Sequence, residues 1–161
     1  MTGPDWLAAW REGGLLTDLD LHFARFIDRL AGAAGSPELT LAAALASHAS
    51  GQGDICVNLP QWARRGLVGA EATPALVCPP IGEWLNRLRA SPVVGRPGQR
   101  HPLVLDRRGR LYLYRYWEYE HRLAEELLRR AEAAALEVDE ERLRADLDRL
   151  FPRHPRLVGP D

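Results

Sequence analysis

The sequence predicts an α+β fold that is mainly helical and includes a small antiparallel sheet of one strand and a C-terminal hairpin. Two observations carry this prediction. Apolar residues recur at three- and four-residue spacing over most of the chain, which is typical of amphipathic helices. Two short regions, around residues 55–59 and 103–116, instead alternate apolar and polar residues as strands do. At 161 residues, with 46% hydrophobic and 27% charged residues, the chain has the composition of one soluble globular domain.

Three helices are expected in the first part of the chain, separated by residues that stop helices. Gly13 and Gly14 end the first, because glycine readily takes the left-handed conformation beyond a helix. Thr17 and Asp20 form a T-x-x-D pattern close to a capping box, which starts the second. Its apolar stripe is Phe23, Ile27 and Leu30. The first helix is expected over residues 5–12, the second from residue 17 to a helix-breaking run at 32–37, and the third over about residues 38–50.

The middle of the chain combines strands and short helices. A strand over 55–59 is stopped by Pro60, which opens a short helix, and a loop over 66–80 leads to an amphipathic helix over 81–90. A glycine-containing turn at 106–109 then joins two β-prone runs. From residue 38 onward this is the element order of a winged-helix unit, with the hairpin as the wing. The hairpin strands and later helices are expected over 103–105, 110–116, 117 to about 136, and 138–151, before a proline-rich tail.

Three tyrosines in the second hairpin strand form a candidate interaction surface. Strict alternation would place Tyr112, Tyr114 and Tyr116 on one face, and Arg115 on the face that meets the core. A helix of the same domain could cover these rings. Tyrosine and arginine are also enriched among the residues that anchor protein interfaces, and aromatic rings can stack on nucleic-acid bases. Packing within the domain, a protein partner and nucleic acid therefore all stay open at this point.

Charge is unevenly distributed along the chain. The overall net charge is −1, but residues 51–116 carry +6 between segments of −3 and −4. A basic segment of this kind is a candidate anion-binding face, and internal charge pairing on a solvated surface is the alternative. Arginine would contact phosphates, so we expect weak, non-specific nucleic-acid binding. The arginines that would make these contacts are Arg64, Arg65, Arg107, Arg108 and Arg110.

The residues needed for several kinds of catalysis are missing. The chain contains no lysine, which excludes a phosphate-binding P-loop and a Schiff-base mechanism built from this chain alone. The histidines lack metal-ligand spacing, no G-x-S-x-G motif is present, and neither Cys56 nor Cys78 has a neighbour that would activate its thiol. We therefore expect no catalytic residue, metal or cofactor. No secretory signal or membrane span is visible, so we expect a cytoplasmic protein that does not bind membranes.

Two groups of motifs nevertheless resemble one known family. The first is TLAAALAS at 40–47 followed by GQGDICVNL at 51–59, and the second is SPVVG at 91–95, PLVLD at 102–106 and RLYLYRYWE at 110–118. Together with LDLHFA at 19–24, these resemble the amino-terminal region of RecD, the alpha subunit of exodeoxyribonuclease V, the RecBCD helicase–nuclease. The likeness covers most of residues 15–151.

The resemblance implies a role for the chain within a larger subunit. RecD is an ATP-dependent 5′–3′ DNA helicase of double-strand break repair and homologous recombination, but its P-loop follows the stretch corresponding to Phe151-Pro152. We expect residues 1–137 to be a docking domain and 138–161 to be a linker helix and tail leading toward an absent motor domain. ATP and magnesium belong to that motor.

The expected partners are RecC and RecB in a heterotrimer, with DNA contacted through the whole complex. Tyr112, Tyr114, Tyr116 and Arg115 are expected to dock on RecC, and the helical face led by Trp6 and Trp10 would take that role if the rings are core. A nucleic-acid-binding winged-helix module is the alternative.

Overall fold

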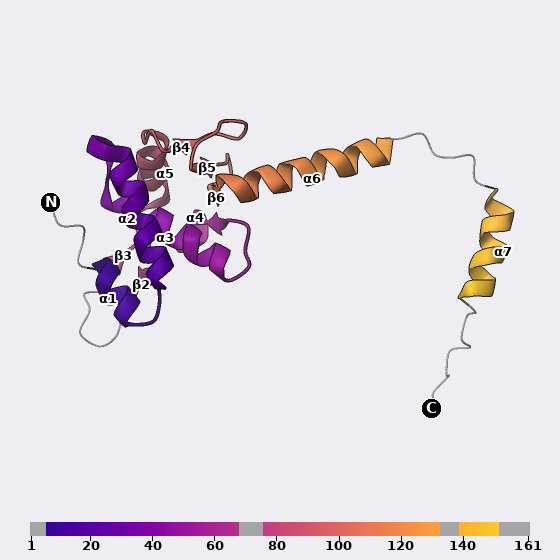
Figure 1. The fold of residues 1–161 in the computed structure, drawn as a ribbon, viewed down its shortest axis with the longest axis horizontal. Helices are drawn as coiled ribbons and strands as arrows, with labels where there is room; N and C mark the ends of the chain where they lie inside the picture. The colour runs from indigo at the N-terminus through magenta and orange to yellow at the C-terminus, as the bar shows by residue number, and fades with distance from the viewer. Residues whose placement is uncertain (1–5, 68–75, 133–138, 152–161) are drawn as a thin grey trace, which may run out of the picture. The chain divides into compact units, whose positions relative to one another are not determined.

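The computed structural model of the chain describes residues 6–67, 76–132 and 139–151. The described residues form two compact units that divide between Leu123 and Ala124 (Figure 1). The domain boundary expected at residues 137 and 138 lies outside the described ranges, as does the proline-rich tail, and that boundary stays a prediction.

Helices α1 to α3 are the first three helices of the first unit. Thr17 caps α2 with the capping box expected from the sequence, and Pro37 occupies the first turn of α3. The buried face of α2 differs from the expected stripe, because Leu21, Ala24 and Ile27 are buried whereas Leu30 is 50% exposed. The small side chain of Ala24 lets α2 lie close to α3, and this contact sets the face that is buried. The bounds are α1 Trp6–Glu12, α2 Asp18–Ala31, a 3₁₀ turn Gly32–Ala34, and α3 Pro37–Gly51.

A four-stranded sheet lies beside these helices in the order β1-β6-β5-β4. Strands β1, β6 and β5 are antiparallel, as the winged-helix order predicts. The predicted antiparallel arrangement of these three strands is confirmed, and the sheet as a whole is mixed, because a fourth strand, β4, adds to β5 in parallel, with Val94 opposite Leu103. Two residues are too short a run to show strand periodicity, so β4 left no sequence signal. The bounds are β1 Val57–Asn58, β4 Val94–Gly95, β5 Leu103–Leu105 and β6 Arg110–Leu113.

Several predicted element ends differ from the structure. The strand expected over 55–59 is shorter, because Leu59 already begins the short helix α4 (Leu59–Trp62). The segment expected to be a loop holds two strands, β2 (Gly66–Leu67) and β3 (Leu76–Val77), which pair antiparallel; the residues between them lie outside the described ranges. Helix α5 (Ile81–Arg89) agrees with the prediction, and its Trp84 and Leu88 are fully buried.

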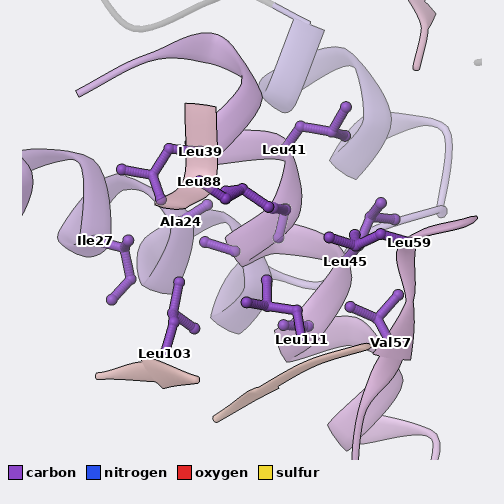
Figure 2. Close-up of a cluster of buried hydrophobic side chains, with 14 of the residues drawn as sticks. Ala24, Ile27, Leu39, Leu41, Leu45, Val57, Leu59, Leu88, Leu103 and Leu111 are labelled. Carbon is purple, nitrogen blue, oxygen red and sulfur yellow. The ribbon is translucent and has the colours of Figure 1, made fainter. Parts of the chain in front are cut away.

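The core of the first unit lies between helices α2, α3 and α5 and the sheet (Figure 2). Helix α3 is buried around almost its whole circumference from Leu39 to Ala46, so it forms the centre of the unit. Trp84 of α5 is fastened to it by a hydrogen bond, in which the indole Nε1–H donates to the Glu38 carbonyl over 2.9 Å. The labelled core side chains in Figure 2 are Ala24, Ile27, Leu39, Leu41, Leu45, Val57, Leu59, Leu88, Leu103 and Leu111.

Two polar helices complete the described chain. Helix α6 (Tyr114–Glu132) follows β6 directly, and α7 (Glu140–Leu150) is capped by the Asp139 carboxylate. The expected strand over 110–116 is therefore wrong beyond Leu113, because the backbone turns helical at Tyr114. Among the described residues, no helix has the length and apolar character needed to cross a membrane.

Candidate interaction surfaces

The three tyrosines expected on one strand face lie in two different elements. Tyr112 is the only one in β6, and it is 2% exposed. Its neighbour Leu111 is also fully buried, so both faces of β6 are covered and alternation cannot separate an outer face there. Burial strongly raises the pKa of the Tyr112 phenol. Tyr112 is thus a core residue, and its ring is not part of an accessible surface.

Tyr114 and Tyr116 lie instead in the first turn of α6 and are half-buried, while Arg115 between them is exposed. Helical spacing brings Tyr114 beside Trp117, with ring centroids 6.2 Å apart, and stacks Trp117 on His121 at 5.0 Å. The sequence pattern missed this row because it was interpreted with a period of two. The spacing i, i+3, i+7 would have identified it.

Beyond this row, α6 presents large apolar side chains to solvent. Tyr119 is 56% exposed and Leu123 is 61% exposed. These two and the half-buried Tyr116 follow each other at three- and four-residue spacing, so they share one face of the helix. Leu127 continues the same spacing within α6 and is 57% exposed. An exposed apolar row on an otherwise polar helix is typical of a protein-binding surface.

The arginine-rich turn of the hairpin is held by one carboxylate. Asp106 Oδ1 accepts the backbone N–H groups of Arg108 (2.9 Å) and Arg110 (2.8 Å), and its Oδ2 accepts Arg110 Nε at 2.7 Å. The hydrogen-bonded ion pair with Asp106 raises the pKa of Arg110 above its ordinary value. Arg107 and Arg108 project from the turn and are exposed. Gly109, at a φ of 79°, closes it.

The other two expected arginines, Arg64 and Arg65, come from a different segment of the chain. Arg64 and Arg65 lie between α4 and β2, where the Arg65 guanidinium sits 5.9 Å from the centre of the Trp62 ring. Arg107 and Arg108 instead line a surface hollow together with Arg89 and Arg96, which sequence inspection did not single out.

The structure also contains a buried polar cluster around Asp20 that was not predicted from the sequence. Asp20, 2% exposed, accepts hydrogen bonds from the Ser47 hydroxyl at 2.6 Å and from Thr17, and it lies 3.5 Å from His48 Nδ1. Burial raises the pKa of Asp20, but the hydrogen bonds from Ser47 and Thr17 and the nearby His48 outweigh it, so this pKa lies below 3.8. Because Ser47 donates to the carboxylate and not to His48, the cluster joins α2 to α3 and does not form a nucleophile.

The two thiols show no sign of activation. Burial raises the pKa of Cys56 and of Cys78, which keeps both protonated at neutral pH. Within residues 6–67, 76–132 and 139–151, no group of His, Cys, Asp and Glu could hold a metal ion.

Comparison with known proteins identifies one family. A model described as the N-terminal domain of the RecBCD enzyme subunit RecD matches residues 12–112. The RecBCD enzyme subunit RecD of Mycobacterium tuberculosis H37Rv is 35% identical over 144 residues, which cover 89% of this chain and 23% of that protein. The protein of the same name from Mycolicibacterium smegmatis is 34% identical over 116 residues, covering 71% of this chain and 19% of that protein. The chain thus spans less than a quarter of the length of these relatives.

Proposed function

This chain belongs to the family of RecD N-terminal domains, and on that premise we propose that it is a non-catalytic domain that docks its subunit onto RecC. In this proposal the chain takes part in a heterotrimer with RecB and RecC. The parent subunit is a 5′–3′ DNA helicase that acts in double-strand break repair, and its ATP and magnesium are bound by motor domains outside this chain. The names of the relatives as subunits of the RecBCD enzyme support the choice of partners.

The observation that carries the docking proposal is the exposed apolar face of α6. Tyr116, Tyr119 and Leu123 share this face, and the last two are more than half exposed. Leaving such side chains in water is unfavourable, and a partner surface that buries them gains roughly 25 cal/mol for each Å² of apolar area covered. Tyr114 and Arg115 lie in the first turn of the same helix and stay in the proposed surface. Tyr112 is not part of the proposed docking surface, because its ring is buried.

A charge placed in this face tests the proposal. We expect Leu123→Asp to weaken association with co-expressed RecB and RecC of the same organism by about 30-fold, since loss of an interface anchor costs about 2 kcal/mol. Leu19→Asp is the matched control, because Leu19 is 71% exposed on α2, away from α6. Titration calorimetry or surface plasmon resonance measures both dissociation constants. Equal affinities of the two variants, or no binding of the unchanged chain, would contradict the proposed docking surface.

The proposed lack of catalysis has a separate test. We expect the purified chain to release no phosphate from ATP, with or without DNA, above a heat-killed control. The reason is the absence of a lysine that could balance the charge of the β- and γ-phosphates. DNA-stimulated phosphate release by the chain would contradict this part of the proposal.

A further inference from the structure

A surface hollow of about 640 Å³ lies where three segments of the first unit meet. These are the end of α5, the turn that follows β4, and the turn between β5 and β6. Each segment contributes arginine to the lining. The arginines are Arg89 from α5, Arg96 from the turn after β4, and Arg107 and Arg108 from the hairpin turn.

The positive charge in this hollow is not neutralised by the protein. Among the described residues that line the hollow, Asp106 is the one carboxylate, and it is engaged by Arg110 Nε at 2.7 Å and by two backbone N–H groups. Among the described residues, none of the four lining arginines forms an ion pair with an acidic side chain. Like charges around one hollow repel each other, so this arrangement favours a bound anion.

Both turns that carry these arginines are held in place by hydrogen bonds. The backbone N–H of Arg96 donates to Gln99 Oε1 at 2.8 Å, and the Gln99 N–H donates back to the Arg96 carbonyl at 2.9 Å. The hairpin turn is fixed by the Asp106 carboxylate, as described above. Fixed backbone positions reduce the entropy that a ligand must remove from the site, and here they fix the backbone that carries Arg96, Arg107 and Arg108.

From this geometry we propose that the hollow binds the phosphodiester backbone of nucleic acid, a function separate from docking on RecC. The guanidinium group donates in a planar fork that fits phosphate oxygens. The part of the lining that the structure describes includes no aromatic side chain that could stack on a base or anchor a protein partner. Contacts limited to phosphates hold a strand without specifying its sequence. In the winged-helix order the hairpin that carries Arg107 and Arg108 is also the wing.

Salt dependence of binding to a fluorescent oligothymidine tests this site. Four arginine–phosphate contacts to a single strand give a slope of about −2.8 in log K against log salt, or about 50-fold weaker binding between about 50 and 200 mM salt. Replacing Arg107 and Arg108 together by alanine halves the slope, so we expect only about a 7-fold change over the same range. Fluorescence anisotropy of the chain itself supplies these affinities.

Two further variants test whether binding depends on positive charge at the hairpin turn, and not on folding or on the total charge of the chain. Arg25→Ala with Arg29→Ala removes the same charge from exposed positions of α2, and we expect the slope of the unchanged chain. Arg107→Lys with Arg108→Lys keeps both charges, so we expect the salt slope of the unchanged chain even though the guanidinium fork is lost. Equal slopes for the hairpin-to-alanine and α2 variants would overturn the proposal, as would a reduced slope in the hairpin-to-lysine variant. Displacement of the oligonucleotide by polyglutamate of equal charge would also overturn it, in favour of an acidic protein segment.

Discussion

Substitution of Asp20 by alanine is expected to destabilise the first unit by about 3 kcal/mol. Asp20 is 2% exposed and is the acceptor for Ser47 Oγ at 2.6 Å, for Thr17 N–H at 2.9 Å and for Thr17 Oγ1 at 2.8 Å. Its removal leaves the Ser47 hydroxyl buried without a partner, which costs about 1–3 kcal/mol. It also removes half of the capping box of α2, which costs about 1 kcal/mol.

Urea unfolding followed by circular dichroism measures this loss. With a denaturant slope of about 2 kcal/mol per molar, the midpoint of unfolding should fall by about 1.5 M. Asp18→Ala is the matched control, because Asp18 is in the same helix turn but exposed, and its pair with Arg11 is worth at most about 1 kcal/mol. Asp20→Asn retains an acceptor and should lose less than Asp20→Ala. If Asp20→Ala costs no more than Asp18→Ala, the buried cluster does not hold α2 against α3 and the reasoning is refuted.

Three further predictions concern pH, a turn and the tyrosines. The folded-state pKa of Asp20 lies below its ordinary 3.8, so the contribution of this carboxylate to stability is present above about pH 4 and is lost as the pH falls through the lowered pKa. Measuring the free energy of unfolding at decreasing pH should show this loss, and the Asp20→Asn variant should not show it. Gly109→Ala should lower the free energy of unfolding in urea by about 1–3 kcal/mol, because φ at Gly109 is +79° and a Cβ there would lie 3.0 Å from Pro60 Cδ. Gly51→Ala is the control and should cost nothing, because a Cβ at Gly51 would meet no atom within 4 Å. Tyr112→Ala should lower the free energy of unfolding by about 3–5 kcal/mol, and Tyr114→Ala by less than half of that, because the Tyr114 ring is only half-buried. If thermal melting shows the larger loss for Tyr114→Ala, the assignment of Tyr112 to the core is contradicted.

The candidate surfaces could be predicted only in part. The arginine-rich hairpin turn is a local pattern, and the structure places Arg107 and Arg108 of this turn in the lining of a surface hollow. The exposed apolar face of α6 was not predicted as a surface from the sequence. The tyrosine pattern failed because the backbone becomes helical at Tyr114, so that only Tyr112 lies in β6, where it and Leu111 are both buried. Arg89 and Arg96 carry no local signal that links them to Arg107, since the hollow joins segments that only the fold brings together.

The sequence by itself determined the helical character of the chain, the family resemblance, and the start of some of its helices. The capping box of Thr17 and Asp20 and the amphipathic helix α5 follow from neighbours three or four residues apart, so their information is local. Only the tertiary structure decided that Asp20 meets Ser47, 27 residues later, and that β4 pairs in parallel with β5. Such contacts depend on how helices and strands pack together, and a side chain carries no local mark of a partner that packing brings to it from a distant part of the chain.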